Sequence, residues 1–589
     1  MTTQLTHLAR LLRTSCLFIS FPVFVAAALG LDYVSQDPLS ESVTVQAQAW
    51  SGSSTRLKVP LIAWGGDIQT VLANGNARVT RGGSAFAEQG LEVSLYREDN
   101  FARQVEGYLR GDTPFLRGTM GMLNMATDVT ERQSFTEMVV IYQLTWSAGG
   151  DALVVKDSIR RPADLKGKTI ALQAYGPHVD YLTTVLSSVG LTTDDVTIRW
   201  MPDLFEAGPD SSSPAMALAQ DAEVDAAMAI IPDALALTSG GSVGTGAEGS
   251  VHGAKILLST KTADRVIADV YAVRRDFYQR YPEVVEKFVV ALAKAEEALR
   301  EQVAANGSEL NETLRASAEL LLDDANMVED MRGMYADARF VGLGGNQRFF
   351  TNPHDQRRFE ALNSEIQNSF LGLGLIQTTR ELSKAPFDYE RLRQLSGASL
   401  VAETKRFDEG AVAAVLSRRQ QMNTLDEGEL YAFEIYFSPN QNAFSSDLYQ
   451  SEFNKVIELV SIYGGALLTI EGHSDPTSYL RAKKNGSQQM VLNRVKQSAK
   501  NLSYSRANAV KDSLMNYGQA MGLSLDPSQF GVVGHGVMKP NTQGASYDAD
   551  GDLSLASAPR TREEWEATRR VVFRLIQVEA EAEVFEPLF

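Results

Sequence analysis

Strand-like and helical runs alternate between residues 57 and 395, and this alternation constrains the fold more than any other feature of the chain. Short apolar runs that predict buried strands are Leu57–Trp64, Leu91–Leu95, Thr169–Leu172, Val196–Met201, Ala226–Ile231 and Lys255–Leu258. Helical patterns lie between them at Phe101–Gly107, His178–Val189, Ala215–Gln220, Pro282–Ala304 and Leu310–Asp323. Such alternation predicts an α/β fold with mainly parallel strands.

Two motifs in this range point to a family. DLKGKTIAL at Asp164–Leu172 precedes a glycine-containing loop and a helical pattern, and EVDAAM stands at Glu223–Met228. With the WGG at Trp64–Gly66, they resemble periplasmic substrate-binding proteins of the nitrate, taurine and aliphatic-sulfonate type. The resemblance covers about residues 57–395. It implies two α/β lobes joined by crossing strands, with a ligand held between them.

Ligands of open α/β sheets bind beyond the carboxyl ends of the strands, which selects particular loops. Glycines there let backbone amides approach a ligand, and the loop Gln173–Pro177 leads into a helix whose N–H groups suit an anion. We therefore expect a small polar or anionic ligand. The candidate ligand-binding residues are Trp64, Gly65, Gly66, Met120, Trp146, Gly150, Asp151, Tyr175 and Gly176.

Each candidate also has a structural alternative. Trp64 and Trp146 could be core aromatic residues, and the glycines could serve only to form turns. Asp151 could orient an amine or cap its own loop. The sequence leaves these alternatives open.

A second pair of motifs lies near the C-terminus. EGHSDP at Glu471–Pro476 follows an apolar run that predicts a buried strand. LSYSRANAV at Leu502–Val510 predicts the start of an amphipathic helix, with Ser503 as N-cap and Arg506 in the first turn. An acid at a strand end and an arginine at a helix start can clamp a zwitterion, because the acid takes an ammonium and the guanidinium takes a carboxylate.

Together with GHG at Gly534–Gly536 and TRRVV at Thr568–Val572, these motifs resemble the OmpA-like peptidoglycan-binding domain over about residues 425–580. The resemblance implies that Asp475 and Arg506 grip the diaminopimelate of the peptidoglycan stem peptide. The chain departs from the family pattern by an insertion at about residues 481–497, which we expect to form an exposed loop or a helix extension. The alternative for Asp475 and Arg506 is an ordinary surface ion pair.

The N-terminal sequence predicts export. Basic residues in Leu8–Cys16 precede the apolar run Ser15–Leu31. A secretory signal cleaved near Ala26–Ala28 and an uncleaved anchor of ~17 apolar residues both fit this pattern. Either predicts the periplasm or cell envelope of a Gram-negative bacterium, with inner-membrane anchoring in the second case. Cys16 is the only cysteine, so the body of the chain has no intrachain disulfide or cysteine-ligated metal.

Several function classes are disfavoured. The net charge of −18 argues against a nucleic-acid partner. The six histidines show no HExxH spacing, and the G-x-S-x-G pattern around Ser242 has no helix after it. We therefore predict no catalytic residues, no metal, no cofactor and no enzymatic activity.

The resulting prediction is an α/β, two-lobed periplasmic-binding-protein fold followed by an α+β OmpA-like domain, with an apolar export or anchor helix in front. The expected segments are 1–31 signal or anchor, 32–56 tether, 57–395 lobes, 396–425 linker and 426–580 peptidoglycan-binding domain. The expected partners are peptidoglycan, the small ligand and a membrane transporter. The alternative is a non-catalytic envelope scaffold whose lobes form a protein-interaction surface.

Overall fold

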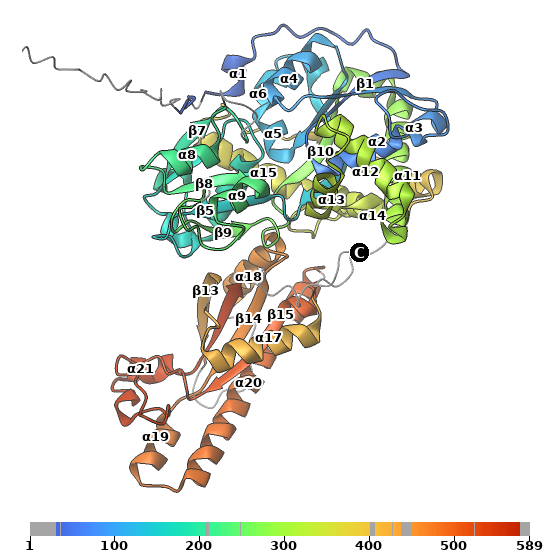
Figure 1. Cartoon of the computed structure of the whole chain (residues 1–589). Helices are drawn as coiled ribbons and strands as arrows, with labels where there is room; N and C mark the ends of the chain where they lie inside the picture. Colours follow the sequence, from blue (N-terminus) through green and yellow to red (C-terminus); the bar gives the residue numbers. More distant parts are fainter. Residues whose placement is uncertain are drawn as a thin grey trace, which may run out of the picture.

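The computed structural model describes residues 31–35, 37–205, 211–247, 249–400, 407–426, 428–437, 449–523 and 525–577 (Figure 1). Apart from Leu31, the expected export segment lies outside these residues, as does part of the expected linker. No helix within the described ranges has both the length and the apolar character that crossing a membrane requires.

The first lobe is built on a sheet with the strand order β11-β4-β10-β3, in which β10 runs antiparallel to both of its neighbours. The short strand β12 also pairs with β4, and the parallel pair β1-β2 lies beside β3. The strands of this lobe are β1 (Arg56–Leu61), β2 (Glu92–Arg97), β3 (Phe115–Thr119), β4 (Met138–Ser147), β10 (Ala268–Arg274), β11 (Ala338–Phe340) and β12 (Ser383–Lys384).

The second lobe has a five-stranded sheet with the order β7-β6-β8-β5-β9. β6 is parallel to β7 and β8, whereas β5 is antiparallel to β8 and β9. The strands are β5 (Asp151–Val155), β6 (Thr169–Gln173), β7 (Thr197–Met201), β8 (Ala226–Ile230) and β9 (Lys255–Ser259).

Helices cover both sheets (Figure 1). They are α1 (Leu39–Ser42), α2 (Ile68–Ala73), α3 (Ala85–Glu88), α4 (Phe101–Arg110), α5 (Met120–Met125), α6 (Thr127–Thr130), α7 (His178–Ser188), α8 (Pro214–Gln220), α9 (Ile231–Leu237), α10 (Arg275–Arg280), α11 (Pro282–Ala305), α12 (Ser308–Leu321), α13 (Val328–Asp337), α14 (Gly342–Thr351), α15 (Phe359–Gly372) and α16 (Tyr389–Ser396). The long helix α11 buries Val285, Phe288, Val289 and Leu292, four apolar residues at helical spacing.

The predicted two-lobed α/β fold is confirmed, but the expectation of mainly parallel strands is wrong. The chain crosses between the lobes twice, from β4 into β5 and back from β9 into β10. The strands that make these crossings enter each sheet in the reverse direction, so β5 and β10 both run antiparallel to their neighbours. The composition of an apolar run predicts a strand but not the direction in which that strand runs in the sheet.

Residues 32–56, expected as a tether, lie against both lobes. The backbone N–H of Val34 donates to the carbonyl of Trp200 in the second lobe at 3.0 Å. The buried Arg274 of the first lobe donates from Nη2 to the carbonyl of Gln48 and from Nη1 to that of Tyr108. This segment therefore bridges the lobes on one side.

The C-terminal module has a four-stranded sheet with the order β13-β16-β14-β15, in which only β14 and β15 are parallel. Its strands are β13 (Glu429–Tyr436), β14 (Leu467–His473), β15 (Phe530–Gly536) and β16 (Arg570–Ile576). Its helices are α17 (Glu409–Met422), α18 (Gln450–Ile462), α19 (Thr477–Lys484), α20 (Gln489–Ala520) and α21 (Arg562–Ala567).

The predicted helix start at Ser503 is wrong. Helix α20 begins at Gln489, because part of the insertion at about residues 481–497 extends the helix toward its N-terminus, which confirms the helix-extension alternative for these residues. The Ser503 hydroxyl donates to the carbonyl of Lys500 at 2.9 Å and accepts from the backbone N–H of Gly536 at 2.9 Å. Arg506 consequently lies in the middle of α20, which packs along β14 and β15.

The turn after α18 contacts the second crossover and α7. The Tyr463 hydroxyl is 2.7 Å from Ser188 Oγ on α7. The backbone N–H of Gly465 donates to the carbonyl of Thr262 at 3.1 Å. A Cβ at Gly465 would meet the carbonyl oxygen of Lys261 at 1.7 Å, so this approach requires glycine.

Candidate functional site

Trp64 and Gly150 meet where the first lobe joins the crossover. Trp64 precedes the short 3₁₀ turn Gly65–Asp67, and its indole N–H donates to Thr145 Oγ1 at 3.1 Å. A Cβ at Gly150 would come within 2.5 Å of the indole ring. The predicted candidates Trp64 and Gly150 are therefore in direct contact.

Asp151 begins β5 and anchors the first crossover. Its Oδ1 lies 2.7 Å from Nε2 of His178, and its Oδ2 accepts from Ser147 Oγ at 2.6 Å. Thr260 on the second crossover accepts from the backbone N–H groups of Gly149 and Asp151. Both Asp151 oxygens therefore have protein partners, and the carboxylate ties the two crossings to α7.

A buried ionic network lies behind Trp64. Arg117 Nε donates to both carboxylate oxygens of Asp67 at 3.1 Å, and its Nη1 donates to Asp269 at 2.9 Å. Asp269 also accepts from Thr145. Burial raises the pKa of Asp67 to about 6, although the charge of Arg117 opposes the shift. This arginine is engaged by two carboxylates and does not offer its charge to an anionic ligand.

Asp180 is the most unusual acid at the junction of the lobes. It lies in the first turn of α7 and is 1% exposed, and among the described residues neither carboxylate oxygen has a hydrogen-bond partner beyond the backbone of Asp180 itself. Burial raises its pKa to about 8, with Arg357 opposing the shift and Glu365 adding to it. A Cβ at Gly121 in α5 would stand 2.5 Å from Asp180 Oδ1, so Asp180 of one lobe packs directly against Gly121 of the other.

Arg357 supplies a buried cation near this acid. It is 3% exposed, and it donates from Nε to the carbonyl of Arg265 at 2.9 Å and from Nη1 to Glu365 at 2.5 Å. Its Nη2 is buried without a hydrogen-bond partner in the described part of the chain. A guanidinium N–H and a carboxylate are thus both left unsatisfied in this region.

The remaining candidate residues of the lobes pack tightly against neighbouring backbone and side-chain groups. A Cβ at Gly65 would clash with the carbonyl of Met334, and one at Gly66 with Thr145. Met120 is fully buried at the start of α5. The Trp146 ring packs edge-on against Phe349 with a centroid distance of 5.9 Å, as in the core alternative.

Tyr175 lies on the approach to α7 in a left-handed conformation, with φ of 59°. Its hydroxyl donates to the carbonyl of Asp37 at 2.6 Å, so it contacts the N-terminal segment. A Cβ at Gly176 would stand 2.1 Å from the Gln173 side chain. Tyr175 thus contacts the N-terminal segment at Asp37, whereas Trp64, Gly150 and Asp151 lie together at the first crossover.

In the C-terminal module, Asp475 follows β14 and is half-buried. Its Oδ1 accepts from the backbone N–H of Thr477 at 2.8 Å, and its Oδ2 accepts from Trp565 Nε1 at 2.5 Å. Each oxygen keeps a further lone pair that can accept from a ligand.

Arg506 is close enough to Asp475 and Arg569 for both charges to act on it. Burial and the like charge of Arg569 lower the pKa of Arg506, and Asp475 opposes this shift. The guanidinium lies over the Phe437 ring at 5.6 Å, and that of Arg569 lies over Trp565 at 3.7 Å. Arg506 Nε and Arg569 Nη2 are buried without partners in the described residues.

Three further side chains have the spacing of metal ligands. The donor atoms of Glu471, His473 and His535 all lie within 4.8 Å of one another. Burial lowers the pKa of His473 well below its ordinary value, so its imidazole is neutral. The sequence predicted no metal site, because these residues show none of the short spacings that identify one.

Several site residues were missed from sequence. Arg569 and Trp565 lie about 60 residues beyond Arg506, and Arg569 could have been found as the first arginine of TRRVV. Asp180 could have been found because it follows the loop Gln173–Pro177 by three residues. The burial that makes Asp180 unusual has no sequence signal.

Residues 85–304 match the protein family described as NMT1/THI5 like. The taurine-binding periplasmic protein of Escherichia coli K12 is 28% identical over 224 residues, which are 38% of this chain and 62% of that relative. The chain therefore spans about three-fifths of the length of this relative.

Two solved structures are similar to part of the chain at low sequence identity. The alkanesulfonate-binding protein SsuA of Xanthomonas axonopodis pv. citri, bound to MOPS, is 15% identical with a TM-score of 0.39, covering 57% of this chain and all of that one. A putative periplasmic sulfonate-binding SsuA of Methylobacillus flagellatus KT is 19% identical with a TM-score of 0.40, covering 61% of this chain and 99% of that one.

Proposed function

We propose that the chain is an exported, non-catalytic binding protein of the Gram-negative cell envelope. It holds a small zwitterion between its lobes and attaches to peptidoglycan through residues 426–580. The match of residues 85–304 to a binding-protein family and the similarity to a taurine-binding periplasmic protein support the first part. A membrane transporter that receives the ligand is the partner expected for such a protein.

The buried Asp180 carboxyl group carries the ligand proposal. A carboxylate that has lost its water without gaining donors is costly, which is why its pKa is raised. An ammonium group would donate to the unpaired oxygens and favour the ionised carboxylate. Asp180 and Gly121 belong to opposite lobes and touch in this arrangement, so an ammonium reaches Asp180 only when the lobes part at this point, and it would then contact both lobes.

The acidic end of the ligand is assigned to Arg357. Its unpaired Nη2 is the donor available near Asp180, whereas Arg117 is engaged by Asp67 and Asp269. A small molecule with an ammonium at one end and a sulfonate or carboxylate at the other would satisfy both groups. Taurine has this form, and it is our first probe.

A matched set of probes tests this ligand chemistry. Calorimetry on the full mature chain would compare taurine with ethanesulfonate, which lacks the amine, and with ethanolamine, which lacks the sulfonate. We expect taurine to bind and both truncated compounds to bind at least tenfold more weakly. Asp180→Asn should remove the preference for the amine, while Asp194→Asn, an exposed acid of the same lobe, should leave it unchanged. Equal binding of taurine and ethanesulfonate would contradict the proposal.

The peptidoglycan proposal is supported by the cluster around Arg506. Arg506 and Arg569 are adjacent, and each has one buried N–H group without a partner in the described residues. An anion between the two guanidinium groups would stabilise both of them. Asp475 lies on the same cluster and can accept an ammonium. The free end of diaminopimelate carries both groups on one carbon, so it matches this arrangement and agrees with the OmpA-like resemblance of these residues.

Retention on purified sacculi tests this half independently. Asp475→Asn and Arg506→Gln should each reduce the retained fraction at least tenfold. Arg562→Gln is the matched control, because its side chain is 82% exposed and pairs with Glu566 on its own helix. Full retention of both variants would contradict the proposal without affecting the ligand assignment in the lobes.

A further inference from the structure

The sheet of the C-terminal module gathers three potential metal ligands in one buried place. Glu471 and His473 are two residues apart on β14, so their side chains project from the same face. His535 lies on β15, the parallel neighbour, where Gly472 pairs with Gly534 and His473 pairs with Gly536 across a register shift. This shift, typical of a β-bulge, lets residues of neighbouring strands converge.

His473 presents a nitrogen lone pair that nothing in the described structure uses. It is 2% exposed, and its Nδ1 lies 3.1 Å from the carbonyl oxygen of Lys539. A carbonyl can only accept, so Nδ1 carries the hydrogen and Nε2 is the unprotonated nitrogen. Nε2 is buried without a hydrogen-bond partner in the described residues. Histidines that bind metals usually have this arrangement, with the second nitrogen donating to a carbonyl or a carboxylate.

Glu471 is held with one oxygen toward the histidines. Its Oε1 accepts from Thr469 Oγ1 at 3.0 Å and from Arg574 Nε at 2.9 Å, while Oε2 lies 2.8 Å from His535 Nε2. Arg574 also pairs with Glu429, so its charge remains compensated if Oε2 takes another partner. The Glu471 side chain is 1% exposed and that of His535 is 4% exposed.

We propose that Glu471, His473 and His535 bind one divalent metal ion of the zinc class. Two imidazoles and one carboxylate are the protein ligands of several four-coordinate zinc sites, in which water takes the fourth position. The ion would occupy the region between Glu471 Oε2 and the two Nε2 atoms, where it would satisfy the lone pair of His473 and replace the hydrogen bond between His535 and Glu471, with the His535 hydrogen moving from Nε2 to Nδ1. Zinc ligand atoms lie ~2.0–2.2 Å from the ion, so the donor atoms, which are now within 4.8 Å of one another, would draw in around it.

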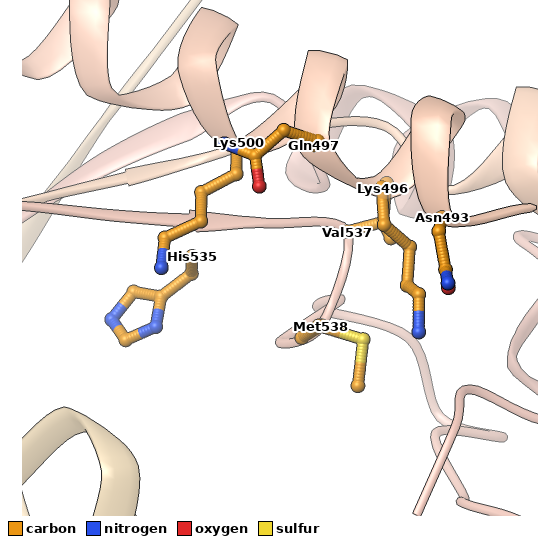
Figure 2. A pocket seen from close by; sticks show the side chains of 7 residues that line it. All are labelled: Asn493, Lys496, Gln497, Lys500, His535, Val537 and Met538. Atoms are coloured by element: carbon orange, nitrogen blue, oxygen red, sulfur yellow. The ribbon is translucent and has the colours of Figure 1, made fainter. Parts of the chain in front are cut away.

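An adjoining cavity gives a route to this place. It has a volume of about 240 Å³, and His535 forms part of its wall (Figure 2). The other lining residues are Asn493, Lys496, Gln497, Lys500, Val537 and Met538. Lys500 reaches toward His535 in Figure 2, but the residue is exposed, so its flexible side chain can turn to solvent.

The metal site would join β14 to β15 two residues before Asp475. It does not depend on the proposed ligand of the lobes or on peptidoglycan binding. Because its ligands come from two strands of one sheet and lie below the surface, the bound ion would stabilise the pairing of these strands.

Zinc content of the untagged full chain tests the inference. The protein would be stripped with chelator, loaded with zinc sulfate, dialysed and measured by elemental analysis and thermal unfolding. We expect close to one zinc per chain and a higher melting temperature with zinc than without. His473→Gln and His535→Gln should each lower zinc affinity at least tenfold and remove the zinc-dependent shift. His252→Gln, an exposed histidine of the second lobe, should change neither.

A cobalt spectrum of the wild-type chain guards against variants that fail to fold. Co²⁺ bound to two imidazoles and a carboxylate in a four-coordinate site gives a strong visible band, and zinc should abolish it by competition. Less than a tenth of an equivalent of zinc retained by the wild type would overturn the inference. Unchanged zinc content in folded His473→Gln and His535→Gln would also overturn it.

Discussion

Asp180 of α7 packs directly against Gly121 of α5, so closely that a Cβ at Gly121 would lie 2.5 Å from Asp180 Oδ1. The two residues come from opposite lobes, and each follows the carboxyl end of a strand. This contact therefore places a buried acid of one lobe against a glycine of the other lobe. The packing of the two lobes therefore depends on the volume of residue 121 and on the charge of Asp180.

Gly121→Ala should impede closure of the lobes. The added methyl group would overlap Asp180, and close-packed interiors do not yield freely to such overlaps. We expect a loss of stability of about 1–3 kcal/mol, together with weaker taurine binding. Gly82→Ala is the control, because a Cβ there meets nothing within 4 Å. Identical unfolding curves for the two variants would show that the lobes do not need this contact.

The stability of the ligand-free protein should depend on Asp180 between pH 4 and pH 8. The folded-state pKa of about 8 exceeds the unfolded value of about 3.9, so the folded state binds the extra proton in this window. The Asp180 contribution to stability is present below the unfolded pKa and is lost as pH rises toward 8. We expect Asp180→Asn to gain in melting temperature relative to wild type as pH rises from 5 to 8. A constant difference across this range would mean that Asp180 titrates normally.

Arg117→Met should be among the most damaging substitutions in the first lobe. It leaves the Asp67 and Asp269 carboxylates buried without their cation. Removing one partner from a buried ion pair typically costs about 3–5 kcal/mol. Arg110→Met breaks only surface ion pairs, with Glu106 and Asp112, and should cost less than about 1 kcal/mol in the same urea titration. Equal costs would contradict the buried network.

Arg569→Gln should weaken retention on peptidoglycan as strongly as Arg506→Gln. In the described part of the chain, both guanidiniums have buried N–H groups without hydrogen-bond partners, and both interact with Asp475. Retention of Arg569→Gln at the wild-type level, in a folded protein, would assign Arg569 to packing on Trp565 alone.

The alternation of strands and helices was sufficient to predict the two α/β lobes, because burial on a sheet leaves a local pattern in the sequence. The strands β5 and β10 were not among the predicted strands, and the general expectation of parallel strands fails at both, since strand direction depends on where the chain crosses between lobes. The start of α20 was placed at Ser503 and lies at Gln489, because a polar insertion can extend a helix without any apolar pattern. Local signals therefore predicted many of the elements but not their connections.

The candidate sites could likewise be predicted only where a local sequence motif marks them. Asp475 and Arg506 were identified through motifs, and the structure places them within electrostatic reach of each other. The orphaned carboxyl of Asp180 arises from contact with Gly121, 59 residues earlier in the numbering, and no local pattern encodes it. Likewise, His473 and His535 are brought together only by the pairing of β14 with β15.

The proton balance of taurine binding tests the central claim most directly. Calorimetry at pH 7 in buffers of different ionisation enthalpy gives the number of protons released when the ligand binds. A protonated Asp180, with a pKa of about 8, must ionise to receive an ammonium, so the wild type should release close to one proton and Asp180→Asn none. Taurine that binds without releasing a proton, or that does not bind at all, would contradict the proposed amine site.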